Sequence, residues 1–478
     1  MELPKIIQGG MGVAISHWGL AKTVSKLGQF GIMSGTGMGL ILSARLSDGD
    51  KDGNMRRAMS HFPMQDAVQR ILDKYYVPEG RGDDGSYRRP PMWTINPSKS
   101  LLELTVVGNF VEVFLAKEGH DNPVGINLLE KLQLPNISSL YGAMLADVDL
   151  AIMGAGIPFE IPGALDNFVN HQAASYRIDV LDNQDQDYTH VFDPEEIFPG
   201  IGDVVGPLKR PMFFPIISSL VLGKALLKRS TGKINGFIVE AASAAGHNAP
   251  PRGPMQLNEI GEPIYGKKDV IDIAKIAKLG LPFYLASGYD SPEGLQEALA
   301  LGANGIQVGT AFAYCSDSGM EPNAREKGIQ KILDEEASVY TDPLFSPTGF
   351  PFKLAQIDGT LSDSSLVEAR QRVCDIGYLR DLYVREKDGK MGYRCPAEPV
   401  KDYVRKGGQI EDTVGRACLC NALGAAAGYS QYRKKLDYTE LPAITSGDTL
   451  PSLGRYIPAG QKTFTAKDVI EYLLGERG

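Results

Sequence analysis

Two glycine-bearing loops in the second half of the chain have the residue types and spacing of a phosphate site. Gly288 is followed twenty-one residues later by Gly309 and Thr310. Glycine lets backbone N–H groups approach a phosphate without a Cβ in the way, and a threonine hydroxyl adds another donor. We therefore expect Ser287, Gly288, Gly309 and Thr310 to contact a phosphate. The alternative interpretation is that these glycines only make tight turns.

A second segment that suits chemistry is GFIVEAASAAGHNAPPRG, residues 236–253. It places Glu240 at the end of an expected strand and His247 on a loop of small residues. Small residues such as Ala245 and Gly246 let the backbone pass close to a planar cofactor, and a histidine at this position suits a general base near neutral pH. We expect His247 to be catalytic. Glu240 either accepts a hydrogen bond from a cofactor hydroxyl or pairs with a neighbouring Lys or Arg.

Further candidates follow other expected strands and suit the ring of a flavin. The carboxamide of Asn127 can donate to and accept from the edge of the ring, although a turn cap is the alternative. Met11 lies between Gly10 and Gly12, where its thioether can stack on an isoalloxazine while backbone groups bond the ring. Ser218 ends another strand and is a weaker candidate.

Eight short apolar segments, most of them separated by helical patterns, indicate the fold that would position these residues. Alternation of this kind is typical of a (β/α)8 TIM barrel, whose functional residues lie at the carboxyl ends of the strands. A doubly wound sheet is the rival, but it would put a GxGxxG motif after the first strand, and the chain has none there. The expected strands are residues 5–8, 31–34, 124–127, 150–153, 213–217, 236–240, 283–286 and 305–308.

Four expected helices lie at residues 19–27, 101–118, 220–228 and 270–279, and two insertions interrupt the pattern. Residues 41–100 contain an expected helix over 54–76 and a proline-rich loop over 78–97, which we interpret as a partial lid. Residues 157–210 have the composition of a surface excursion. We assign residues 1–340 to an α/β barrel domain and residues 341–478 to an α-rich extension.

Four of the five cysteines fall in that extension, at Cys374, Cys395, Cys418 and Cys420. Four thiolates can bind zinc or an iron–sulfur cluster, but a single C-x-C without a C-x-x-C does not match the common motifs. Free buried thiols are the interpretation we adopt, so no metal is assigned.

The composition excludes several classes of protein. Of the 478 residues 43% are hydrophobic and 22% charged, and the net charge is −9, which is unsuited to nucleic acid or anionic lipid. No apolar run is long enough for a membrane span, and five cysteines do not form a secreted disulfide framework. We expect a cytoplasmic enzyme with a small-molecule substrate, and a homo-oligomer is left open.

Three motifs together resemble the nitronate monooxygenase family, formerly called 2-nitropropane dioxygenases, which are FMN-dependent TIM barrels. The motifs are IIQGGMG at residues 6–12, Glu240 with AGH at 245–247, and Gly288 with the stretch from 302 to 310. The resemblance implies FMN as cofactor. It assigns the phosphate to Gly288, Gly309 and Thr310, the ring and ribityl chain to Asn127, Met11 and Glu240, and the substrate side to His247.

The resemblance also implies oxidation of alkyl nitronates by O2 to a carbonyl compound and nitrite. Tyr289 stands where family members often have a second glycine, and the smaller members lack the extension, so the substrate is open. NAD(P)H-dependent quinone or enoyl-thioester reductases on the same barrel are the first alternative. A flavin-binding sensor or assembly subunit and a phosphosugar or nucleotide barrel are lesser ones.

Overall fold

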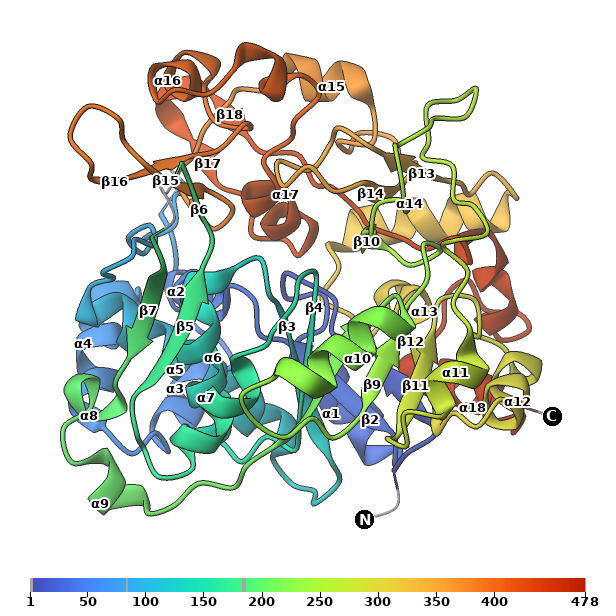
Figure 1. Ribbon diagram of the computed structural model, residues 1–478, viewed down its shortest axis with the longest axis horizontal. Helices are drawn as coiled ribbons and strands as arrows, with labels where there is room; N and C mark the ends of the chain where they lie inside the picture. Colours follow the sequence, from blue (N-terminus) through green and yellow to red (C-terminus); the bar gives the residue numbers. More distant parts are fainter. Residues whose placement is uncertain (1–2, 83–84, 183–185, 478) are drawn as a thin grey trace.

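Eight parallel strands form a closed barrel in the lower half of the molecule as drawn (Figure 1). The computed structural model describes residues 3–82, 85–182 and 186–477. Pairing of the first strand with the last closes the ring in the order β1-β12-β11-β9-β8-β4-β3-β2, so the barrel is confirmed and the open sheet is wrong. The strands are β1 Ile6–Gln8, β2 Phe30–Ser34, β3 Val124–Leu129, β4 Leu150–Gly154, β8 Met212–Ile217, β9 Phe237–Val239, β11 Phe283–Ala286 and β12 Gly305–Val308.

The strands are apolar because both of their faces are buried. Alternate side chains fill the inside of the barrel, where Ile7, Phe30, Ile152, Phe214 and Tyr284 pack together. The remaining strand side chains pack outward against the surrounding helices. Burial on both faces produces the short unbroken apolar runs from which these strands are predicted.

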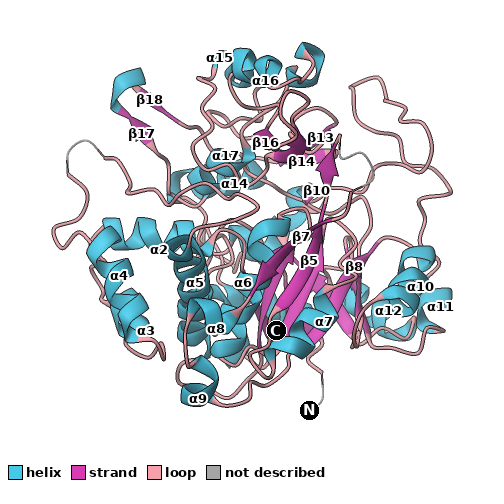
Figure 2. Cartoon of the chain, turned by 60° about the vertical axis from the view of Figure 1, so that its left-hand side comes forward, coloured by secondary structure: helices cyan, strands magenta, loops and turns pink. Residues whose placement is uncertain are grey.

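The expected helices surround the barrel, with boundaries shifted by one or two residues except at one of them (Figure 2). Residues 270–279 contain only α11, Ile273–Ala277, because Asp272 caps its first turn and Gly280 leaves the helix with a positive φ of 74°. The helices that follow the barrel strands are α1 Trp18–Lys26, α5 Lys99–Lys117, α6 Gln133–Leu145, α7 Ile161–Phe168, α10 Leu220–Arg229, α12 Pro292–Ala300 and α13 Thr310–Tyr314.

The first insertion differs from expectation at two places. The helix expected over 54–76 is two helices, α3 Asn54–Met59 and α4 Gln65–Tyr75, because Pro63 cannot continue a helix. The loop over 78–97 is not a lid, since none of its described residues lines the large cavity at the barrel mouth. It lies against the C-terminal region instead, where Arg89 donates to Asn421 at 3.2 Å. Residues 83 and 84 of this loop lie outside the described residues.

The second insertion contains an antiparallel hairpin on the outside of the barrel. Its strands are β5 Ala174–Ile178 and β7 Tyr188–Phe192, and β5 alternates between buried and exposed residues. The short strand β6, Val180–Leu181, leaves the hairpin and pairs with β15 of the C-terminal region. Two short helices, α8 Pro194–Ile197 and α9 Ile201–Val205, follow, and residues 183–185 lie outside the described residues.

The C-terminal region covers the barrel mouth and contains strands as well as helices. Strand β14, Phe352–Ala355, pairs on one side with β13, Val339–Asp342, and on the other with β10, Gly246–His247, from the loop after β9. The boundary expected at residue 340 therefore falls inside β13. The remaining elements from α2 onward are α2 Met38–Ser47, α14 Pro322–Leu333, α15 Ser364–Ala369, β15 Asp381–Val384, β16 Met391–Arg394, α16 Val400–Arg405, η1 Ile410–Thr413, α17 Leu419–Ala426, β17 Tyr432–Arg433, η2 Lys434–Leu436, β18 Tyr438–Thr439, η3 Leu450–Tyr456 and α18 Ala466–Leu473.

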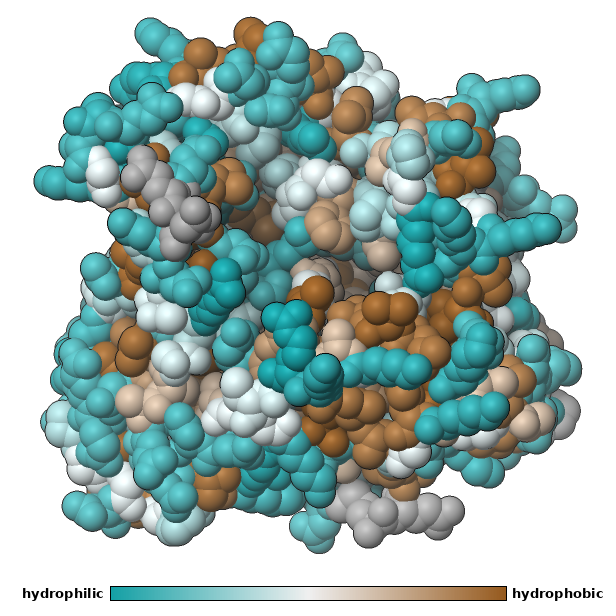
Figure 3. Space-filling model, in the orientation of Figure 1, coloured by the Kyte–Doolittle hydropathy of each residue, from teal (hydrophilic) through white to brown (hydrophobic). Residues whose placement is uncertain are grey.

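The surface is hollowed where the C-terminal region meets the barrel, and apolar side chains gather below the hollow over α10 (Figure 3). Val221 and Leu227 of this helix are exposed. Among the described residues, no helix is long and apolar enough to cross a membrane.

Candidate functional site

The loops after the barrel strands and the C-terminal region enclose a cavity of about 280 Å3. It lies at the carboxyl end of the strands, where barrel enzymes carry their chemistry. Ser218 is not among the residues that line this cavity, and its carbonyl accepts a hydrogen bond from Arg252 at 2.8 Å. The other candidates from the sequence all line it: Gly10, Met11, Gly12, Asn127, Glu240, Ala245, Gly246, His247, Ser287, Gly288, Gly309 and Thr310.

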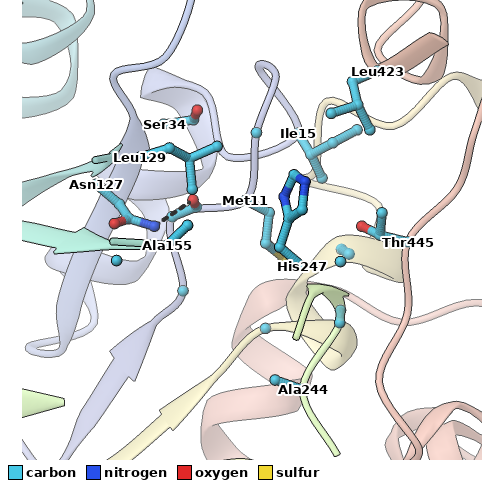
Figure 4. Close-up of a pocket in the computed structure, with 18 of the residues that line it drawn as sticks. Met11, Ile15, Ser34, Asn127, Leu129, Ala155, Ala244, His247, Leu423 and Thr445 are labelled. Atoms are coloured by element: carbon cyan, nitrogen blue, oxygen red, sulfur yellow. Dashed lines mark hydrogen bonds between the residues drawn. The ribbon is translucent and has the colours of Figure 1, made fainter. Parts of the chain in front are cut away.

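The loop after β1 lies tightly against Asn127 at the end of β3. The Nδ2 of Asn127 donates to the carbonyl of Gly10 at 3.0 Å (Figure 4). A Cβ at Gly10 would stand 2.3 Å from the Cβ of Asn127, so only glycine allows this approach. The N–H of Met11 donates to Ser16 Oγ at 2.9 Å, which fixes the turn. The Met11 side chain thereby lines the cavity beside His247.

Two uncharged acceptor atoms at this site are buried and have no hydrogen-bond partner among the described residues. They are Oδ1 of Asn127 and Oε1 of Gln307, and both residues line the cavity. A buried acceptor without a donor is costly, and it points to a group that supplies the donor. Gln307 was missed in the sequence, although a glutamine inside the apolar strand GIQV is a signal for it.

The loops after β11 and β12 bring the expected phosphate contacts to one side of the cavity. Ser287 has a φ of +73° and Gly288 a φ of +94°, and no heavy atom lies within 4 Å of a Cβ built on Gly288. The backbone there is therefore open to the cavity. The Thr310 hydroxyl accepts a hydrogen bond from the N–H of Gly447 at 2.9 Å, so the C-terminal region holds this corner in place.

Glu240 ends β9 inside the cavity with its side chain unpaired. Burial raises the pKa of its carboxyl group to about 7. No ion pair of Glu240 occurs within the described ranges, so the carboxyl group is free to accept from a ligand. Of the two roles the sequence left open, pairing with a Lys or Arg is the one that the geometry does not support.

His247 reaches into the cavity from β10 (Figure 4). Its Nε2 is 2.8 Å from Ser346 Oγ, and its ring packs edge-on against Phe352 with 4.8 Å between centroids. Burial, and then the positive charge of Lys131, lower the pKa of the imidazole to about 3. The ring is therefore neutral at neutral pH, whereas the sequence suggested a general base that titrates there, and the catalytic role of His247 stays a prediction.

Sequence reasoning missed the wall that the C-terminal region contributes. This wall is mostly apolar, and α17 supplies several of its residues. No local pattern links residues more than forty positions beyond the last barrel strand to the cavity. The C-terminal lining consists of Phe352, Ile376, Tyr378, Leu379, Leu419, Cys420, Leu423, Ala426, Ala443, Ile444, Thr445, Gly447 and Thr449.

Comparison with known proteins gives a partial match to a curated relative. No family model matches the chain. A "Probable nitronate monooxygenase" of Bacillus subtilis (strain 168) is 33% identical over 145 residues, which are 30% of this chain and 39% of that protein. The resemblance to the nitronate monooxygenase family is confirmed.

A second relative bears a different activity in its name. It is the (3aS,4S,5R,7aS)-5-hydroxy-7a-methyl-1-oxo-octahydro-1H-indene-4-carboxyl-CoA dehydrogenase of Mycobacterium tuberculosis (strain ATCC 25618 / H37Rv), 26% identical over 119 residues. The match covers 25% of this chain and 30% of that protein. The chain thus matches well under half the length of either curated relative.

Solved structures align along almost the whole chain at low similarity. FabK from Thermotoga maritima has a TM-score of 0.47 and 14% identity, covering 100% of this chain and 93% of its own. Nitroalkane oxidase from Streptomyces ansochromogenes has a TM-score of 0.41 and 14% identity, covering 99% and 96%.

Proposed function

We propose that this protein is an FMN-dependent oxidoreductase. The observation that carries the proposal is the cavity at the barrel mouth, in which glycine loops after β11 and β12 face two unpaired acceptors from β3 and β12. The resemblance to the nitronate monooxygenase family supports it.

The residues at the cavity suit FMN in both of its polar parts. Gly288, Gly309 and Thr310 would hold the phosphate through open backbone groups. The unpaired oxygens of Asn127 and Gln307 would accept from the N–H and hydroxyl groups of the cofactor. When bound, FMN supplies an electron sink for hydride or single-electron chemistry.

The charge and polarity of the residues that line the cavity indicate which kind of substrate it suits. Among the described residues, the cavity wall contains no Lys or Arg, while Glu240 and Asp290 belong to it. An anionic nitronate would therefore meet no Lys or Arg on the cavity wall, and His247 is neutral. The apolar wall from the C-terminal region suits an uncharged, chain-like substrate instead. We therefore favour NAD(P)H-dependent reduction of an enoyl thioester.

His247 would orient such a substrate rather than remove a proton. The Ser346 Oγ accepts from the N–H of Thr348 at 3.2 Å and lies 2.8 Å both from the Thr348 hydroxyl and from His247 Nε2. We propose that the Thr348 hydroxyl donates to Ser346 and that the Ser346 hydroxyl donates to His247 Nε2. With Nε2 accepting, Nδ1 carries the proton of the neutral ring and can donate to a thioester carbonyl oxygen. Apolar residues such as Leu423 exclude water from the same space.

Oxidation of alkyl nitronates by O2 is the second candidate. It is favoured by the name of the Bacillus subtilis relative. The described lining of the cavity, which has no Lys or Arg to meet the anion, does not add to that support. In that reaction a carbanion-like carbon gives up electrons, and a carbonyl compound and nitrite are released.

One anaerobic experiment separates the candidates. The purified protein is mixed with NADH or NADPH, and separately with ethylnitronate, while the flavin absorbance is followed. We expect bleaching by a nicotinamide cofactor and recovery on addition of a long-chain 2-enoyl thioester. Bleaching by the nitronate alone would favour the monooxygenase. Bound flavin without turnover on either set would favour a sensor, and colourless protein would contradict the proposal.

A further inference from the structure

The four cysteines of the C-terminal region converge in space although three separate segments carry them. Cys374 follows α15, Cys395 follows β16, and Cys418 and Cys420 stand at the start of α17. All four thiols are free, and all four line one small enclosed space beside the large cavity. The fold thus brings four thiols from three segments of the chain to one place.

Three of the four cysteines pack against one another. Cys395 and Cys418 form one small cluster with Ala397, and Cys420 packs against it. Cys374 lines the same small space as these three. The group therefore behaves as one cluster rather than as isolated buried thiols.

A hydrogen-bond donor from α17 is directed at one of the sulfur atoms. The Nδ2 of Asn421 lies 3.5 Å from Cys418 Sγ. N–H groups around thiolate ligands stabilise their negative charge and orient them toward a metal centre.

Buried positive charge surrounds the same space. Arg370 has only 1% of its side chain exposed, lies 3.8 Å from Glu440 and donates to the carbonyl of Ala397 at 2.8 Å, while Arg380 lines the space itself. Arg372 donates to the carbonyl of Pro396 at 3.0 Å, next to Cys395. Glu398 is the one carboxylate at this space among the described residues, and Lys406 pairs with it at 2.6 Å. A centre with four thiolate ligands carries net negative charge, which these arginines would offset.

We propose that Cys374, Cys395, Cys418 and Cys420 hold an iron–sulfur cluster. Among the described residues no three His, Cys, Asp or Glu side chains are placed to hold a single metal ion. A tetrahedral zinc ion with Zn–S bonds of 2.3 Å needs its sulfur ligands about 3.8 Å apart. An iron–sulfur cluster bonds each thiolate to a different iron atom, so its ligands stand further apart. Ligation would release the thiol protons to solvent.

The cluster would lie next to the proposed flavin site. Leu379, Leu419 and Cys420 line both the small space and the large cavity. The inference does not depend on the proposed function, because iron content is measured whether or not flavin is bound.

The test is metal analysis of the full chain purified without oxygen. We expect about four iron atoms and four acid-labile sulfides per chain, and absorbance near 400 nm that remains after the flavin has been removed. Cys395→Ser is expected to lose most of the iron. Cys315→Ser is the matched control, because Cys315 is also buried but lies at the end of α13, away from the cluster.

Three outcomes would overturn the proposal. They are zinc in place of iron, iron retained in full by Cys395→Ser, or no iron even after reconstitution of the wild-type chain with ferrous iron and sulfide. Reconstitution of the wild type keeps the test decisive if the serine variant does not fold.

Discussion

Burial raises the pKa of the Glu240 carboxyl group to about 7, so this group is partly protonated at neutral pH. The pKa of Glu240 in the folded chain is raised above the ordinary value of 4.5. The contribution of this carboxyl group to the free energy of unfolding is therefore fully present below pH 4.5 and is lost as the pH rises through 7. At the carboxyl end of a barrel strand, this makes cofactor-free protein sensitive to pH.

Glu240→Gln removes this titration. We expect the variant to gain stability relative to wild type as the pH rises from 5 to 8, by at most about 3 kcal/mol. Urea unfolding of the cofactor-free proteins at both pH values measures the difference. Glu259→Gln, at an exposed position, is the control and is expected to show no such trend. A difference in the free energy of unfolding between Glu240→Gln and wild type that is the same at both pH values would contradict the raised pKa of Glu240.

Gly309→Val tests the phosphate corner. A Cβ at Gly309 comes no closer than 3.8 Å to Met11 Sδ, so the fold tolerates it, but the methyl groups of valine extend toward the cavity. We expect flavin affinity to fall by about tenfold to a hundredfold, because crowding a packed site costs about 1 to 3 kcal/mol. Equilibrium dialysis against FMN measures it, with Gly266→Val at an exposed open position as control. Unchanged affinity would remove the phosphate from this corner.

At this scale the sequence identifies residue types but not their environments. Glycine and small residues after apolar runs are local signals. Of the thirteen candidate residues predicted from the sequence, twelve line the cavity and Ser218 does not. The pKa of His247 is a different case. It depends on Phe352 and Lys131, which lie far from His247 in the chain, and no local pattern reports their approach.

Helix α17 supplies apolar residues to the wall of the cavity. Its residues Leu419, Leu423 and Ala426 line the cavity opposite the barrel loops. An apolar wall of this kind stabilises a substrate in proportion to the apolar area it covers.

Leu423→Ser is expected to raise KM for a long-chain enoyl thioester about tenfold, because roughly 1.5 kcal/mol of apolar contact is lost. A four-carbon thioester, which does not reach the wall, is expected to show little change. Leu436→Ser, at an exposed position in η2, is the matched control. Equal effects on both chain lengths would mean that the wall does not contact the substrate.

The barrel elements are predictable for a reason that does not extend to the covering ones. Strands buried on both faces leave unbroken apolar runs, and the caps of α12 and α11 are local, as when Ser291 accepts from the N–H of Gly294 at 3.0 Å. Strand β10 exists only through its pairing with β14, and β14 also pairs with β13; a single segment does not encode such pairing. The break at Pro63 has a local signal, because proline cannot continue a helix, although the residues on both sides have a helical pattern.

At the scale of the whole molecule, the barrel and the C-terminal region form one unit. Strand β14 pairs with β10, the hydroxyl of Tyr314 bonds Ser446 at 2.9 Å, and helix α18 packs on α1. The covering region therefore completes the cavity as well as protecting apolar surface.

A chain truncated after residue 340 tests this dependence. We expect it to expose the apolar barrel mouth, to bind a hydrophobic dye such as ANS, and to retain no flavin. Dye fluorescence and flavin content, compared with the full chain, measure the two effects. A soluble, flavin-bound truncation product would instead mean that residues 1–340 fold and function independently.

The hydrogen bond between Thr310 and Gly447 joins residues 137 positions apart, and this separation has a consequence for biosynthesis. The ribosome completes all eight strands of the barrel well before it adds the C-terminal segment that covers the barrel mouth. A nascent chain halted between these two points would have an uncovered barrel mouth, and we expect it to hold no prosthetic group. Loading would then be a late event, coupled to the arrival of the last segments.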